Sequence, residues 1–133
     1  MALLVGERVP VGRNPELSTT SYFSFRACRA VALGVGGHLS GPFERLEPEY
    51  RTAAIEHLLA LPEEIGLPDP RQLVPVMVEV HSRHPHLNLL NTEAVAAALL
   101  LNARMLLTPP TASGQLAKVL TDEDISFMAV ELP

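Results

Sequence analysis

Three histidines lie close together at positions 81, 84 and 86, and histidine is a common zinc ligand. The spacing of His81 and His84 can place both rings on one face of a helix. Pro85 interrupts helical geometry, however, and no Cys or Asp stands beside the three histidines to complete a ligand set. Polar histidines at a helix C-terminus, where the helix dipole favours positive charge, account for the pattern better than a metal site.

Two further patterns have a structural explanation as well. The glycine-rich stretch GVGGHLSG at residues 34–41 follows an expected helix and lacks the lysine of a phosphate-binding loop, which runs from a strand into a helix. It is better explained as a helix end followed by a turn.

Cys28 is the only cysteine, so no internal disulfide can form, and we expect it to act as a small apolar residue on a helix.

Most of the acidic residues fall on expected polar helix faces or in caps, and Glu93 is the exception. It lies in the first turn of a strongly apolar expected helix, where a carboxylate either favours the helix N-terminus or lines a pocket. The run Asp122, Glu123 and Asp124 is typical of a solvated turn between a helix and a strand.

The composition is that of a globular protein without a strongly basic surface. The chain of 133 residues fits a single domain, with 47% hydrophobic residues to supply a core. A net charge of −5 argues against sequence-independent nucleic-acid binding. The longest apolar run, residues 94–101, is far shorter than a membrane span, and the N-terminus lacks the features of a signal peptide. We expect a soluble, cytoplasmic protein with no membrane partner.

Periodicity and capping signals give the expected elements of the first half. Residues 2–5 are a strand candidate, and Ser18 or Thr19 can cap a helix that runs to about Leu33. A second helix is expected over residues 48–61. The segment 71–81 is ambiguous, because alternating valines resemble a strand and Pro75 would disturb a helix, whereas Asp69 and Pro70 form a clear helix start. We favour the helix.

The second half has the order of a βαβ unit. A helix capped by Asn91 or Thr92 is followed by the strand RMLLT, the loop PPTASG, the helix GQLAKVL and the strand SFMAVEL. A helix so apolar on all sides must be buried, against a sheet or a partner subunit. The order predicts an α/β fold. At the carboxyl end of the first strand, where such sheets usually hold their chemistry, Thr108, Pro109 and Pro110 provide no acid, His or Cys.

The segment TEAVAAALLLNARMLLTPP, with the downstream helix and the strand DEDISFMAVEL, resembles the C-terminal half of PIN domains, over residues 89–132. Glu93 stands where that family has an acid at the start of an Ala-rich helix, and Leu106, Leu107 and Thr108 match its next strand. The resemblance implies a helix-rich, three-layer α/β/α fold with a small, mostly parallel sheet. It also implies a relation to Mg²⁺- or Mn²⁺-dependent ribonucleases, some of them toxins of toxin–antitoxin pairs.

The chain departs from the PIN pattern at the acids that hold the metals. Where the family's first strand ends in Asp, this chain has Gly6 and Glu7, and the acid expected after Thr108 is replaced by Pro109 and Pro110. A central-helix acid would be Glu56 or Glu79. Only Glu93 and Glu7 then remain as ligands, too few for a site that activates water with two metal ions.

Three functions follow from these residues. The first is a PIN-like domain, residues 1–133, that has lost nuclease activity and needs no cofactor. It acts by binding a protein, or RNA, and is either a homo-oligomer or a component of a complex with a partner protein. The second is a Mg²⁺- or Mn²⁺-dependent endoribonuclease with a rearranged carboxylate set of Glu93, Glu7 and either Glu79 or Glu56. The third is an unrelated small α/β enzyme or ligand binder with a pocket between Thr108 and Ser113. We favour the first.

Overall fold

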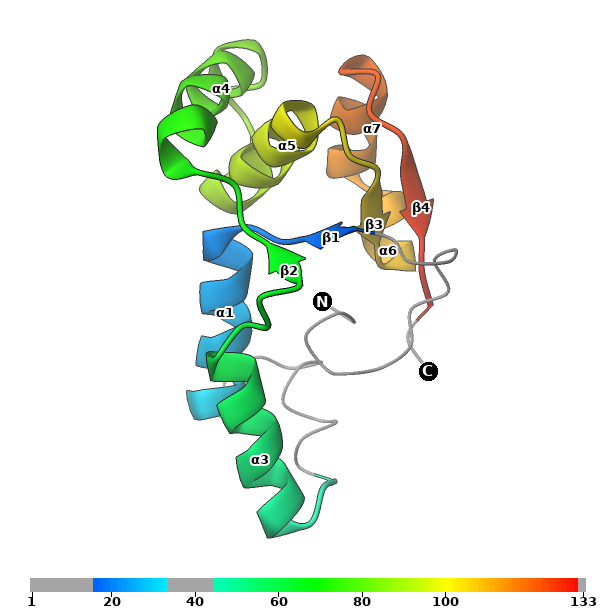
Figure 1. Cartoon of the computed structure of the whole chain (residues 1–133). Helices are drawn as coiled ribbons and strands as arrows, with labels where there is room; N and C mark the ends of the chain where they lie inside the picture. The colour runs from blue at the N-terminus through cyan, green and yellow to red at the C-terminus, as the bar shows by residue number, and fades with distance from the viewer. Residues whose placement is uncertain (1–15, 34–44, 132–133) are drawn as a thin grey trace. The chain divides into compact units, whose positions relative to one another are not determined.

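A computed structural model describes residues 16–33 and 45–131 (Figure 1). The expected strand at residues 2–5 and the candidate ligand Glu7 lie outside these ranges. The chain forms two compact units, Met1–Leu67 and Pro68–Pro133, and each is described by itself. The expectation of one domain over residues 1–133 stays a prediction.

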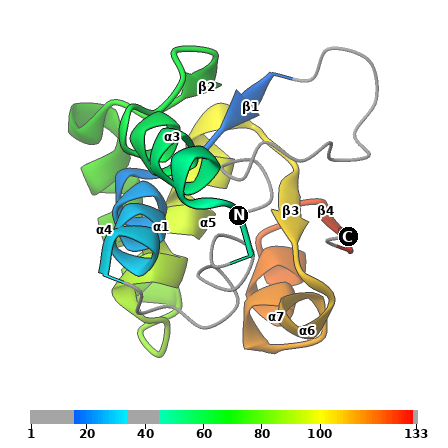
Figure 2. The ribbon, with the colours of Figure 1, turned by 90° about the horizontal axis from the view of Figure 1, so that it is seen from below.

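The N-terminal unit contains two helices that pack together, α1 (Ser21–Leu33) and α3 (Pro48–Leu59) (Figures 1 and 2). Their contact centres on Ala27, which is 2% exposed. Five partly buried residues pack against it: Cys28, Ala54, Ile55, Leu61 and Ile65. Both predicted helices are confirmed, but α1 begins later than expected. The Phe23 amide donates to Thr20 Oγ1 at 3.3 Å, so Thr20, and not Ser18 or Thr19, caps the helix.

A short parallel strand pair in the same unit has no counterpart in the sequence prediction. Strand β1 (Leu17–Ser18) pairs with β2 (Ile65–Gly66) across almost fifty residues of chain. A Cβ at Gly66 would lie 2.8 Å from Ser18 Oγ, a side-chain atom that can rotate away, and 3.7 Å from the Leu17 carbonyl oxygen, so the approach of the two backbones does not require glycine. Two-residue strands are too short to produce an alternating pattern.

Helix α4 (Pro70–Arg83) opens the C-terminal unit and resolves the ambiguity over residues 71–81 in favour of a helix. Asp69 caps it by accepting a hydrogen bond from the Arg71 amide at 2.9 Å. Burial follows the helical period, because Leu73 and Val80 are buried while Val74 and Val78 are exposed. Alternating valines in a strand would instead have shared one face.

Helix α5 (Leu89–Leu101) is the centre of the C-terminal unit, with α4 packed against it and α7 on another side (Figure 1). Every residue from 92 to 98 is buried. The cap is Asn88, whose Oδ1 accepts from the Asn91 amide at 2.8 Å, so the expected caps Asn91 and Thr92 were wrong by about one turn. Because α5 begins earlier, Glu93 is its fifth residue and lies beyond the first turn.

The predicted βαβ unit is confirmed, although its elements are shorter. Strand β3 (Met105–Leu107) leads through α6 (Pro109–Ala112) and α7 (Gln115–Asp122) to β4 (Phe127–Ala129), which lies parallel to β3 (Figure 2). The segment expected as the loop PPTASG contains the four-residue helix α6, which Pro109 and Pro110 begin. The structure is therefore helix-rich α/β with small parallel sheets.

The core of the C-terminal unit joins α4, α5, α7 and the two strands. Val80, Val95 and Leu120 are fully buried at its centre. Its other buried members are Leu73, Leu87, Ala96, Ala97, Ala98, Leu107, Leu116, Val119 and Ile125. None of the helices in residues 16–33 and 45–131 combines the length and apolar character needed to cross a bilayer.

Two of these helices end on a left-handed residue that is not glycine. Asn102 (φ 49°) follows α5 and Asp124 (φ 56°) follows α7. The Ala103 amide donates to the Ala98 carbonyl at 3.0 Å, and the Ile125 amide donates to the Leu120 carbonyl at 2.8 Å. Each helix therefore closes in a Schellman motif, in which Asn and Asp are the tolerated alternatives to glycine.

Replacing Asn102 should separate backbone strain from side-chain contacts. We expect Asn102→Ala to lower the free energy of unfolding by about 1 kcal/mol, because Ala lacks the short polar side chain with which Asn offsets the strain of a positive φ. Asn102→Gly removes the Cβ and should raise it by a few tenths. Urea unfolding measures both. As a control of opposite sign, Glu79→Gly in the helical backbone of α4 should lower stability by about 1 kcal/mol. Equal effects of Gly and Ala at position 102 would contradict the assigned conformation.

Candidate functional site

Glu93 is a buried carboxylate on α5 of the C-terminal unit. It is 8% exposed, and its neighbours in α5 from Thr92 to Ala98 are buried as well. The explanation from the helix dipole does not hold, because that effect falls off within the first turn and Glu93 lies in the second. Glu93 is thus the one carboxylate among the buried polar residues of the described segments.

The structure does not place the other candidate acids in a metal centre. Glu79 is exposed on α4, Glu56 is exposed on α3 in the other unit, and Glu7 lies outside the described residues. Throughout residues 16–33 and 45–131, no three His, Cys, Asp or Glu side chains lie close enough together to hold a metal ion. Hard cations such as Mg²⁺ need several oxygen ligands around one point.

At the carboxyl end of β3, the polar side chains form hydrogen bonds with groups of the same turn. Thr108 is the residue before α6, and its Oγ1 lies 3.0 Å from Thr111 Oγ1. Ser113 Oγ donates to the Pro110 carbonyl at 3.1 Å. Thr108, Pro109 and Pro110 are exposed. The hydroxyl groups of Thr108, Thr111 and Ser113 form hydrogen bonds within a single short turn, so they do not converge on a ligand.

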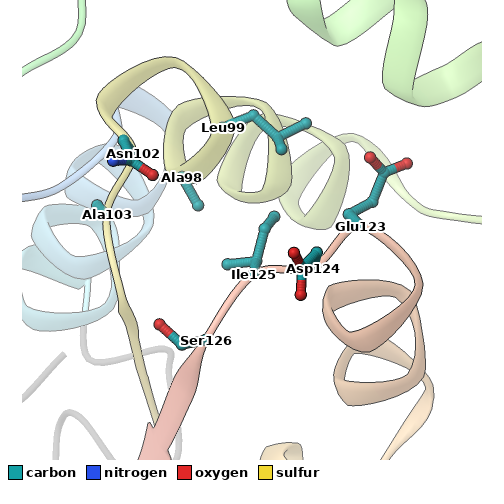
Figure 3. A pocket seen from close by; sticks show the side chains of 8 residues that line it. All are labelled: Ala98, Leu99, Asn102, Ala103, Glu123, Asp124, Ile125 and Ser126. Carbon is teal, nitrogen blue, oxygen red and sulfur yellow. The ribbon is translucent and has the colours of Figure 1, made fainter.

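A hollow of about 240 Å³ lies at the opposite end of the strands, between the C-terminal ends of α5 and α7 (Figure 3). Its lining residues are Ala98, Leu99, Asn102, Ala103, Glu123, Asp124, Ile125 and Ser126. Helix C-termini carry partial negative charge, and Glu123 and Asp124 add carboxylates. Arg83 pairs with Glu123, so Asp124 and the helix ends supply the negative charge of this hollow.

Glu123 forms a polar cluster with Arg83 and His84, so it departs from the solvated turn expected at residues 122–124, where Asp122 and Asp124 are exposed as expected. Arg83 donates from Nε to Oε1 at 2.7 Å and from Nη2 to Oε2 at 3.0 Å, a bidentate pair. His84 Nε2 lies 2.7 Å from the same Oε1. The side chains of His84 and Glu123 are only 12% and 11% exposed. The cluster fastens the end of α4 to the end of α7.

The histidine cluster is thereby divided. His84 engages Glu123, and the His86 ring meets the His84 ring edge-on with centroids 6.1 Å apart. His81 is exposed on the last turn of α4. Sequence reasoning missed the role of Glu123, because its partners lie about forty residues earlier and no local pattern marks the pair.

The hydrogen bonds from Arg83 hold the pKa of Glu123 below its ordinary value, against burial, which raises it, and His84 lowers it further. The folded-state pKa therefore lies below the unfolded value of about 4.3. The interaction stabilises the fold fully above that pH, and its contribution is lost as the pH falls through the folded-state pKa.

Glu123→Gln should lower the free energy of unfolding at pH 7 by about 1 kcal/mol, a value reduced by the solvent exposure of Arg83. The difference from the unmodified protein should shrink below about pH 4, as the pH falls through the folded-state pKa. Thermal unfolding at several pH values measures it. The neighbouring variant Asp122→Asn, at an exposed side chain, should change stability by less than about 0.5 kcal/mol at all of them.

Comparison with known proteins adds no relative. The chain matches no family model, no curated protein and no solved structure. The resemblance to PIN domains consequently rests on the helix that carries Glu93 and on the strand that ends at Leu107, and it stays a prediction.

Proposed function

We propose that this chain is a cytoplasmic PIN-like domain that has lost nuclease activity and acts by binding another protein. In this proposal α5, β3, α7 and β4 are the C-terminal half of a three-layer α/β/α fold. Their order and the parallel pairing of β3 with β4 agree with that half.

The observation that carries the proposal is the dispersal of the carboxylates. Glu93 is buried on α5, Glu79 is exposed on α4, and the tip of β3 presents two prolines. Water activation by two metal ions requires acids that converge on both ions. The described part of the chain supplies Glu93 alone near the position that the resemblance implies.

Charge supports a protein partner over RNA. The chain carries a net charge of −5, and the hollow at the ends of α5 and α7 is lined by carboxylates and helix C-termini. RNA binding draws most of its affinity from cationic contacts to phosphates. Val74 and Val78, one turn apart on α4, leave apolar surface exposed that a protein partner can cover.

A metal titration tests the loss of nuclease activity. We expect the melting temperature to stay unchanged in Mn²⁺ or Mg²⁺ up to millimolar concentrations and a mixed RNA pool to remain uncleaved. A site that binds an ion at a hundred times its dissociation constant would add about 2.7 kcal/mol of stability, which a thermal scan detects easily.

The same titration on Glu93→Gln provides the matched control. If the unmodified protein is stabilised by Mn²⁺ and cleaves RNA, and Glu93→Gln does neither, the nuclease alternative with Glu93 as ligand replaces the proposal. Cleavage that survives in Glu93→Gln would remove Glu93 from the site, and it would still contradict the loss of activity.

A further inference from the structure

The sheet of the C-terminal unit has an open edge at β4. Within residues 16–33 and 45–131, this sheet consists of β3 and β4 only. The Met105 amide donates to the Ser126 carbonyl at 3.0 Å, and the Val130 amide donates to the Leu107 carbonyl at 2.8 Å. In a parallel ladder with this register, Met128 faces β3, whereas Phe127 and Ala129 turn their N–H and C=O groups away from it.

An edge of this kind is a template for another strand. Parallel sheets in α/β proteins are normally larger than two strands, and a pair of three-residue strands has little stability by itself. Ala129 is exposed, so backbone groups that point outward beside it are accessible to an added chain. An extended peptide that pairs with such an edge gains main-chain hydrogen bonds regardless of its sequence.

The charges near β4 favour an added strand that carries basic side chains. From residue 122 to 131 there are four acidic residues and no basic residue. Glu123 is engaged by Arg83 and His84, which leaves the exposed carboxylates of Asp122, Asp124 and Glu131 at the two ends of the strand. Basic side chains at both ends of an added strand would complement them.

A second copy of this chain fits the edge poorly. Two-fold pairing of β4 with itself would run antiparallel and bring Asp124 of one copy close to Glu131 of the other. Like charges opposite each other across a strand pair are destabilising.

We infer that β4 is the docking strand of this protein and that its partner is an extended, basic segment of another protein, which adds to the sheet through Phe127 and Ala129. The inference rests on the proposed protein-binding function and names its site. The partner's main chain would supply the hydrogen bonds, and its lysines or arginines would meet Asp124 and Glu131.

The probe is a synthetic seven-residue peptide of alternating lysine and valine, with a glutamate–valine peptide of the same pattern as its comparison. Bound to the full chain at ten times its dissociation constant, the basic peptide should slow hydrogen exchange of the Phe127 and Ala129 amides about tenfold. The Met128 amide faces β3 already and should change less. Protection elsewhere without protection of these two amides would overturn the inference.

Variants test the two parts of the recognition separately. Ala129→Pro removes an outward N–H and no bond to β3, and it should abolish peptide binding while the circular dichroism spectrum is kept. Asp124→Asn and Glu131→Gln keep side-chain size, and Asn tolerates the left-handed backbone at 124. Each should weaken binding about two- to fivefold at low salt. Glu64→Gln, at an exposed carboxylate of the other unit, should leave it unchanged.

The outcomes distinguish this inference from the proposed function. Absence of binding at about 1 mM peptide, or equal binding of the acidic peptide, would overturn the docking strand and leave the loss of nuclease activity intact. Mn²⁺-dependent RNA cleavage would overturn the proposed function whatever the peptide does. If Ala129→Pro fails to fold, Asp124→Asn, Glu131→Gln and the hydrogen-exchange pattern of β4 still test whether β4 is the docking strand.

Discussion

The need to cover α5 on all sides shapes the C-terminal unit. A helix whose residues from 92 to 98 are all buried has no face to offer to water, so other elements must enclose it. Helix α4 packs along it, and the βαβ unit of β3, α7 and β4 contributes Leu107, Leu116 and Leu120 to the same core. The residues that pack with Val95, Ala96 and Ala97 in this core all belong to the C-terminal unit.

This covering also decides what Glu93 can do. Glu93 is only 8% exposed, so the residues around it separate its carboxylate from ions in solution. The chemistry at the tip of β3 is limited in another way, because Pro109 and Pro110 start a short helix there.

Much of the fold could be predicted, and the errors have identifiable causes. Helix α4 was recognisable from Asp69 and Pro70, and the βαβ unit from the order of its apolar segments. The start of α5 was misplaced because Thr92 looks like a cap, whereas Asn88 satisfies the free amides one turn earlier. The pairing of β1 with β2 and the cluster at Glu123 depend on residues far apart in sequence, which leave no periodic signal. The candidate site stays a prediction, since its acids were chosen by resemblance and Glu7 lies outside the described residues.

The two left-handed helix ends have a consequence for how this sequence can vary. Asn102 and Asp124 are exposed, and most exposed positions accept almost any residue. Their backbone conformation favours glycine, asparagine and aspartate, so among homologues these two sites should appear as small polar or glycine positions. An observer of such an alignment would take Asn102 for a functional residue, when what is preserved there is the direction in which the chain leaves α5.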